Sequence, residues 1–306
     1  MNDKCDVHYN YLTFIVNIVI ISAIFISCRK VNDEQFINRP LSGMLFYNKS
    51  SGMYKYDLKE RSFQMVIAYP ENKMILDDIT MINNNKFIVE ELVDGLYGIS
   101  LVDKEIKFLR DGTKSVFIPE HNKILFYARD KVDKGRYKLY IAKIDTLNQP
   151  LFISNAPNTI KPYQKPVQIS KDVVIFIGEN DTLCAYNIAT NSIKSTMISI
   201  NALPMVWLKS ANRLLCSWSG GGNIKIYSID LQKKIIEEYN SLPDAVCIEY
   251  VEKIDMLLYS KHEYGYLGEL GKVKYSLLGY FPKDKATMQI GTDLGISNFI
   301  YFPELK

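Results

Sequence analysis

The sequence has few of the residues from which metal centres and nucleophilic active sites are usually built. Its 306 residues include 3 histidines, and only His121 and His262 lie outside the N-terminal segment. Neither has a carboxylate at the spacing of a metal-binding motif, so we predict no zinc site. The chain also lacks a Gly-x-Ser-x-Gly elbow, and no serine or cysteine can be paired with a histidine from sequence. We therefore expect no catalytic residue, no metal and no cofactor, and we favour a protein that is not an enzyme.

A strong net charge and a phosphate-binding loop are also missing. The 37 basic residues nearly balance the 34 acidic ones, for a net charge of +3. This balance gives no electrostatic reason to expect a nucleic-acid partner. The glycines at 220–222 lack the Lys-Ser/Thr pair of a phosphate loop and lead into an apolar strand pattern, which indicates a hairpin. The basic run at 129–138 is interrupted by Asp130 and Asp133, so we interpret it as a solvated loop.

Cysteine is sparse, and its spacing does not indicate a disulfide framework. Outside the N-terminal segment the cysteines are Cys184, Cys216 and Cys247, an odd number with no close pair. We interpret them as small buried hydrophobic residues. A bridge between neighbouring repeats, joining Cys216 to either of the other two, is the alternative.

Tyrosine, by contrast, is abundant and periodic. Six of the 21 tyrosines recur in the same local setting, at intervals of 43, 43, 46, 41 and 39 residues: Tyr54, Tyr97, Tyr140, Tyr186, Tyr227 and Tyr266. The positions two and four residues after each are mostly apolar, which is the period-2 pattern of a strand. A strand-rich repeat of about 40–45 residues is typical of a β-propeller blade, in which these segments would be the third strands.

The other strands of each blade fall at similar offsets from these tyrosines. Apolar runs precede them and shorter, more polar runs follow, as expected for an exposed outer strand. First strands are expected at 79–82, 116–118, 167–169, 205–208, 246–250 and 287–290. We therefore predict an all-β fold, a β-propeller of six blades with four antiparallel strands each, in which 287–290 starts the N-terminal blade.

One segment does not fit this count. Residues 298–302 look like an additional strand beyond the predicted closure. This strand either closes the ring itself or belongs to an incomplete seventh blade together with residues 35–38. Seven blades are therefore the alternative architecture.

The N-terminus carries an apolar stretch at 11–27, followed by Cys28-Arg29-Lys30. Residues 25–28, Phe-Ile-Ser-Cys, resemble a bacterial lipoprotein signal, and this resemblance implies lipid attachment at Cys28. Two features depart from that pattern: Phe25 replaces the usual leucine, and residues 1–10 contain one lysine against two aspartates. An uncleaved anchor and an ordinary cleaved signal are the alternatives. We divide the chain into a signal peptide or anchor at 1–27, a tether at 28–42 and a propeller at 43–306.

From about residue 43 onward the repeat shape resembles bacterial envelope β-propellers, broadly the six-bladed lipoprotein and Tol-translocation type. The chain lacks regular Trp-Asp or Tyr-Trp-Thr-Asp blade motifs, so the resemblance assigns no functional residue. It implies a membrane-anchored protein of the cell envelope, at the outer membrane if the cell has two membranes. A single-pass membrane protein is the alternative.

In a propeller, the loops that enter the first strands surround one end of the central channel. Here these loops offer six weak candidates for the channel rim: Asp77, Asp78, Lys114, Lys165, Asp244 and Lys285. Their charges alternate in sign and include no carboxylate cluster. The simplest interpretation is that each is a solvated rim residue.

We hypothesise a monomeric, non-catalytic, membrane-tethered interaction or scaffold module that binds an envelope protein or a glycan through one loop face. One alternative is a propeller enzyme, hydrolase-like or lactonase-like, that acts on a carbohydrate. Another is an envelope inhibitor or immunity protein. An exposed aromatic patch on one face would favour an interaction module. Three or more carboxylates converging in the channel mouth would favour an enzyme.

Overall fold

The computed structural model describes residues 35–36, 39–71, 75–91, 95–129, 136–147, 150–153, 165–178, 181–199, 201–220, 223–263 and 274–303. The chain divides into two units, Met1–Ile37 and Asn38–Lys306. The first unit contains the short strand β1 (Gln35–Phe36). The predicted leader and Cys28 lie outside the described residues. Among the helices that are described, none combines the length and the apolar character needed to cross a membrane.

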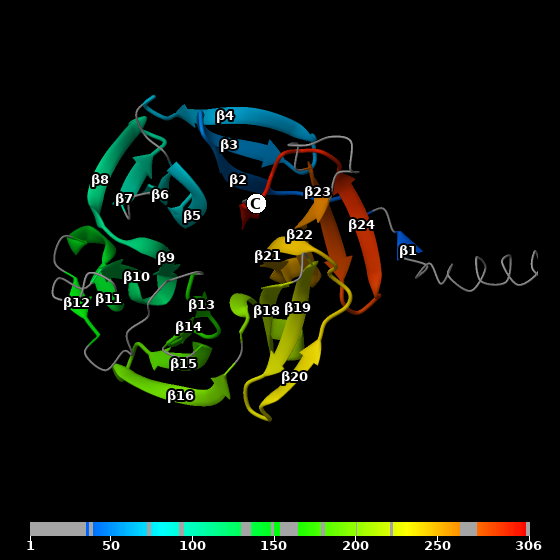
Figure 1. Cartoon of the computed structure of the whole chain (residues 1–306). Coiled ribbons are helices and arrows are strands. Elements are labelled where there is room, and N and C mark those ends of the chain that lie inside the picture. Colours follow the sequence, from blue (N-terminus) through cyan, green and yellow to red (C-terminus); the bar gives the residue numbers. More distant parts are fainter. Residues whose placement is uncertain are drawn as a thin grey trace, which may run out of the picture. The chain divides into compact units, whose positions relative to one another are not determined.

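The second unit forms six sheets of four antiparallel strands, arranged as the blades of a β-propeller (Figure 1). The predicted fold class is therefore confirmed. The first three blades, each given from first to fourth strand, are β25 (Ile300–Phe302), β2 (Met44–Lys49), β3 (Gly52–Asp57) and β4 (Ser62–Ala68); β5 (Ile75–Asn83), β6 (Lys86–Glu91), β7 (Gly95–Ser100) and β8 (Glu105–Asp111); and β9 (Thr113–Ile118), β10 (Lys123–Arg129), β11 (Tyr137–Lys143) and β12 (Leu151–Phe152).

Blades 4 to 6 follow in chain order. They are β13 (Val167–Gln168), β14 (Val173–Ile177), β15 (Thr182–Asn187) and β16 (Ser192–Ser199); β17 (Leu203–Leu208), β18 (Arg213–Gly220), β19 (Asn223–Asp230) and β20 (Ile235–Glu238); and β21 (Ala245–Val251), β22 (Met256–Glu263), β23 (Lys274–Phe281) and β24 (Ala286–Gly291).

Closure of the ring differs from the expectation for residues 287–290. This segment lies in β24 and pairs with β23 as the fourth strand of blade 6. The segment that seemed surplus contains β25, which pairs with β2 and so supplies the first strand of the N-terminal blade. The two ends of the unit therefore share blade 1, and no exposed edge is left at the junction. The described strands of this unit form six blades, so the seven-blade alternative is wrong.

In blades 1, 2, 3 and 5 the repeated tyrosine occupies the same position of the third strand. In blade 4 Cys184 occupies this position, and Tyr186 lies two residues further on. Because side chains on a strand repeat every two residues, Tyr186 matches the same pattern while being displaced. In blade 6 Leu278 occupies the equivalent position and pairs with Tyr259. Tyr266 lies outside the described residues, and the corrected intervals from Tyr54 onward are 43, 43, 44, 43 and 51.

Short 3-10 helices connect the first and second strands of three blades: η1 (Pro119–His121), η4 (Lys209–Ala211) and η5 (Glu252–Ile254). Each ends at a residue in the left-handed region, with φ of 50° at Asn122, 54° at Asn212 and 49° at Asp255. Asparagine and aspartate adopt this conformation more readily than other non-glycine residues. These residues therefore allow the chain to reverse before each second strand.

The hydrophobic core lies between neighbouring blades. Phe46 of blade 1, for example, packs on Phe87 of blade 2, with ring centroids 4.8 Å apart. Cys184, Cys216 and Cys247 are buried and free. Their interpretation as small core residues is therefore confirmed, and neither of the alternative bridges forms. The core holds each first strand at a fixed depth along the central channel.

Candidate functional site in the central channel

The six first strands line the channel, and each contacts the first strand of both neighbouring blades. At the middle and mouth positions their pairing with the second strands is equivalent in every blade, so matching residues form rings around the axis. The floor residues lie two positions before the middle ones along the chain. We name three rings along the direction of these strands. The floor ring is Asp78, Lys114, Lys165, Pro204, Cys247 and Asn298. The middle ring is Thr80, Val116, Val167, Val206, Glu249 and Ile300. The mouth ring is Met81, Phe117, Gln168, Trp207, Tyr250 and Tyr301.

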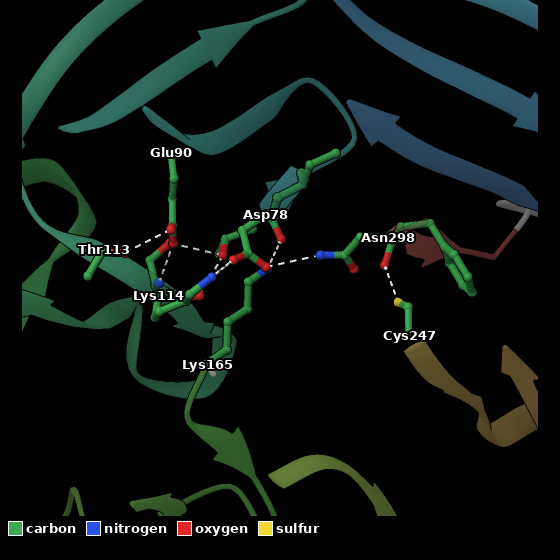
Figure 2. Close-up of polar contacts among 11 residues, drawn as sticks. Asp78, Glu90, Thr113, Lys114, Lys165, Cys247 and Asn298 are labelled. Carbon is green, nitrogen blue, oxygen red and sulfur yellow. Dashed lines mark hydrogen bonds and ion pairs between the residues drawn. The ribbon is translucent and has the colours of Figure 1, made fainter. Parts of the chain in front are cut away.

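The floor ring is a network of charged groups centred on Asp78 (Figure 2). The Lys114 ammonium donates a hydrogen bond to Asp78 Oδ2, and the Asn298 amide donates to Oδ1 over 3.1 Å. Lys165 Nζ lies 3.7 Å from Asp78 Oδ1 and donates to the Ile79 carbonyl. The exposed fractions of the three charged side chains are 12% for Asp78, 19% for Lys114 and 22% for Lys165. The network therefore joins blades 1, 2, 3 and 4 across the channel.

Burial alone would raise the pKa of Asp78, but the two lysines and the hydrogen bonds from Lys114 and Asn298 outweigh it and lower that pKa. Glu90 of β6 lies behind this aspartate and is 1% exposed. Its oxygens accept hydrogen bonds from the Thr113 hydroxyl over 2.9 Å and the Ser115 backbone N–H over 3.2 Å (Figure 2). Burial, with a further contribution from the Asp78 charge, raises the pKa of Glu90 to about 7.

Two further hydrogen bonds link neighbouring first strands near the floor ring. The Thr80 hydroxyl donates to the Ser115 carbonyl over 2.7 Å. The Cys247 thiol points to the Phe299 carbonyl, with 3.6 Å from sulfur to oxygen. Burial raises the pKa of the Cys247 thiol, so this group remains a neutral donor. These bonds tie blade 2 to blade 3 and blade 6 to blade 1.

The structure brings together three of the six candidate rim residues, namely Asp78, Lys114 and Lys165. They lie mostly buried and ion-paired, which corrects their interpretation as solvated groups. Asp244 precedes β21 and accepts a hydrogen bond from the His262 backbone N–H through its own carbonyl. The side chain of Asp77 lies outside the described residues. Lys285 is an error of strand assignment: it lies exposed in the turn between β23 and β24, on the outer side of blade 6.

Three polar side chains of the channel were not named from the sequence: Glu90, Glu249 and Asn298. Glu90 and Glu91 end the apolar run at 87–91, and Glu249 is a single charged residue within the apolar segment 245–251. A charge at such a position is itself a signal, because burying it requires a partner. Asn298 was missed because its strand was assigned to the surplus segment.

The middle and mouth rings surround a cavity of about 550 Å³. All six first strands contribute to its lining. The middle ring is apolar except for Thr80 and Glu249. Within the described part of the chain the Glu249 carboxylate has no hydrogen bond or ion pair. Burial raises the pKa of Glu249 to about 7, although the positive charge of Lys165 acts in the opposite direction.

The mouth ring contributes four aromatic side chains, all partly exposed: Phe117, Trp207, Tyr250 and Tyr301. Charged groups beyond them pair with one another. Lys209 Nζ lies 2.5 Å from Glu252 Oε1, and the Gln168 amide donates to Glu120 Oε2 over 3.0 Å. Glu120, Lys209 and Glu252 belong to connections between first and second strands, and Gln168 is the last residue of β13. The hollow end of the channel is therefore opposite to the loops that enter the first strands, where the sequence placed the candidate site.

The polar groups of the channel can bind other groups but form no metal-binding cluster among the described residues. The floor ring combines one carboxylate with two ammonium groups, an amide and a thiol, which hold each other in place. Among the described residues, no group of three or more histidine, cysteine, aspartate or glutamate side chains is placed to hold a metal ion. The groups that face the cavity offer aromatic surface, the Glu249 carboxylate as an acceptor and the Lys165 ammonium as a donor.

No family model and no curated protein matches the sequence. Solved structures share its fold. TolB from Acinetobacter baumannii is 14% identical over 88% of this chain and 68% of its own, with a TM-score of 0.64. A chain of a nidogen/laminin complex is 8% identical over 85% of this chain and 98% of its own, with a TM-score of 0.57. An oligogalacturonate lyase in complex with manganese is 12% identical over 77% of this chain and 69% of its own, with a TM-score of 0.50. At these identities the likeness is one of fold, and this chain is a six-bladed β-propeller with TolB-like structural neighbours.

Proposed function

We propose that this protein is a non-catalytic interaction module of the cell envelope, tethered to the membrane through its N-terminal segment with Cys28 as the lipid attachment site. It binds a partner at the hollow end of the propeller channel. The observation that carries the proposal is the mouth ring, which exposes four aromatic side chains above a floor whose charges are already paired. The resemblance of the repeat to envelope propellers and the fold likeness to TolB support the location.

Aromatic side chains at such a mouth are well suited to binding. Tyrosine and tryptophan offer a large contact area with few rotatable bonds, so their ordering entropy is small. They are also enriched among the residues that dominate binding energies. The mouth ring places Trp207, Tyr250 and Tyr301 on three consecutive blades, 5, 6 and 1. A partner that enters the channel end would contact all three.

The carboxylates of the channel bear on the enzyme alternative. Asp78, Glu90 and Glu249 all have shifted pKa values. Three is the number of converging carboxylates that would favour an enzyme. These three do not converge on one point of the cavity, however. Glu90 is buried behind the floor ring, and Asp78 is held by two lysines. Both carboxylates therefore hold blades together, and of these three only Glu249 lines the cavity.

Affinity capture tests the proposed function. The full-length protein, tagged at its C-terminus, is recovered from native envelope extract beside two variants, Trp207→Ala at the mouth and Phe108→Ala at the outer strand β8. Phe108 is 49% exposed and serves as a matched aromatic control. We expect a partner that is retained by wild type and Phe108→Ala and lost by Trp207→Ala. Equal recovery by all three proteins, or no specific partner, would contradict the proposal.

The tether has its own test. Cells are labelled with a fatty-acid precursor, and wild type is compared with Cys28→Ala. We expect label on the wild-type protein and none on the variant, which should also leave the membrane fraction. Label on both proteins would reject Cys28 as the attachment site, and membrane retention of an unlabelled wild type would favour an uncleaved anchor.

A second candidate function is a propeller enzyme with Glu249 as a general acid or base. The supporting observation is a carboxyl group with a pKa of about 7 in a cavity, since proton transfer is most efficient when the pKa lies near the working pH. A screen of glycoside and lactone substrates would test it. Turnover that is lost in Glu249→Gln and retained in Phe108→Ala would establish this function in place of the first.

A further inference from the structure

The charges around the channel cavity balance, and this narrows the choice of ligand. Three lysines and three glutamates line it: Lys165, Lys171, Lys209, Glu120, Glu249 and Glu252. Lys209 and Glu252 form an ion pair, and Lys165 faces both Asp78 and Glu249. A charged ligand would enter a site that offers no net opposite charge. Because burying an unmatched charge is unfavourable, the cavity disfavours both acidic and basic ligands.

The same lining suits a polar molecule without charge. Glu249 has a carboxylate that accepts hydrogen bonds and lacks a partner among the described residues. Lys165 supplies a donor nearby. The Thr80 hydroxyl is already engaged with Ser115, because it donates to the Ser115 carbonyl and accepts from the Ser115 hydroxyl over 3.0 Å. A neutral ligand rich in hydroxyl groups can donate to Glu249 and accept from Lys165 without disturbing the floor ring. The lining combines polar and apolar surface in comparable amounts, so it offers hydrogen-bond partners beside its aromatic side chains.

The aromatic side chains add a second requirement. Trp207, Tyr250 and Tyr301 stand at the cavity mouth and are partly exposed. A sugar ring has one apolar face formed by its C–H groups and a periphery of hydroxyl groups. Aromatic rings carry negative charge on their faces and attract such C–H groups. The cavity of about 550 Å³ also lies within the range of about 300–1,000 Å³ of typical ligand pockets.

We propose that the channel cavity binds a neutral saccharide, with Glu249 and Lys165 contacting its hydroxyl groups and the aromatic side chains of the mouth ring stacking on its rings. The inference rests on the proposed function and specifies its partner as a glycan. A protein partner, which the proposed function also allows, is the competing outcome of the experiment.

Calorimetric titration of the full-length protein tests the proposal, in a detergent whose head group is not a sugar. The neutral probes are maltohexaose, cellohexaose and laminarihexaose. The charged probes are hexagalacturonate and a chitosan hexamer. We expect at least one neutral probe to bind more tightly than either charged probe. Binding of none of the three neutral probes, or tighter binding of a charged one, would overturn the proposal.

Variants then locate the site. We expect Trp207→Ala and Glu249→Ala each to weaken binding of the neutral probe at least tenfold, and Phe108→Ala to leave it unchanged. Glu249→Gln preserves the side-chain shape and guards against loss of folding; we expect it to weaken binding at least fivefold. Unchanged affinity in folded Glu249→Gln and Trp207→Ala would place the saccharide elsewhere and reject the site. If no saccharide binds but a captured protein still requires Trp207, this inference fails while the proposed function stands.

Discussion

The two ends of the channel are built from the same six strands, yet one end is closed by charged side chains and the other is open and aromatic. The floor ring contains Asp78, Lys114 and Lys165 and is closed by their mutual contacts. The mouth ring lies three residues further along each first strand, contains no charged residue and remains open. Ionisable residues at the centre of a propeller are therefore no guide to a site by themselves. What distinguishes the two ends is that the floor places charged side chains against one another, whereas the mouth presents partly exposed aromatic surface.

The difference also has an energetic side. At the floor, each charge is withdrawn from water and depends on partners from other blades, so the contacts hold the ring of blades together. At the mouth, aromatic surface remains partly in water, where covering it would be favourable. We therefore expect changes at the floor to alter stability and changes at the mouth to alter binding.

The largest effect is expected for Asp78→Ala. This change leaves two mostly buried lysines without their carboxylate, and we expect a loss of about 3–5 kcal/mol in the free energy of unfolding. Asp284→Ala is the matched control, because Asp284 forms an exposed ion pair with Arg39 at 2.7 Å, which is worth about 0–1 kcal/mol. Urea unfolding of both variants measures the contrast. Equal losses would mean that the floor ring does not stabilise the propeller.

The next effect is a dependence on pH that arises at Glu90. Its folded pKa of about 7 lies above the ordinary value of 4.5, so the folded state holds a proton that the unfolded state releases. The resulting stability is fully present below about pH 4.5 and is lost as pH rises through about 7.

We expect Glu90→Gln to reduce the loss of unfolding free energy between pH 5 and pH 8 by about 2–3 kcal/mol relative to wild type. Denaturant unfolding at the two pH values gives this difference for each protein. An identical pH dependence in wild type and Glu90→Gln would show that Glu90 does not titrate in this range.

A smaller effect on stability should distinguish Lys165 from Lys285, both of which were named from the sequence as rim candidates. Lys165→Met removes a donor to the Ile79 carbonyl and one of the charges near Asp78, and we expect a loss of about 1–3 kcal/mol. Lys285→Asn changes an exposed turn residue with φ of 51°, a conformation that asparagine tolerates. Its effect should stay within about 0.5 kcal/mol. Thermal unfolding compares the two, and a larger loss for Lys285→Asn would contradict the strand assignment of blade 6.

At the mouth we expect a small change in stability and a large change in binding. Trp207→Ala removes a partly exposed side chain that makes no contact needed by the floor ring. We expect a loss of about 1 kcal/mol in the free energy of unfolding. The same variant should lose binding in the capture and titration experiments. If Trp207→Ala unfolds as readily as Asp78→Ala, the mouth is a structural element and the contrast between the two ends disappears.

Much of the architecture was readable from the sequence because a propeller repeats. The period near 43 residues identified most of the strands, and it gave the correct number of blades. It failed where the repeat is irregular. The long connection between β22 and β23 separates Leu278 from Tyr227 by 51 residues. The tyrosine count therefore assigned β23 as a fourth strand and β24 as a first strand, each one position later in the blade order than it is. The same shift placed Lys285 on the channel rim.

The candidate site was only half predictable. Asp78, Lys114 and Lys165 were named because they precede first strands, but nothing in the sequence states that three blades bring them together. The aromatic mouth was not seen at all, since Phe117, Trp207, Tyr250 and Tyr301 lie in four separate strands. Each looks like ordinary core in its own segment. Only the equivalent register of the blades places them in one ring.

The sequence by itself determined the class of fold, the blade count and the burial of the three cysteines, because strand periodicity and hydrophobic pattern are local properties that repeat. Tertiary structure alone decided how the ring closes, which end of the channel is hollow and which charges are paired. Those properties depend on contacts between side chains of different blades. Such contacts are fixed by pairing register and closure, which no single segment of the chain contains.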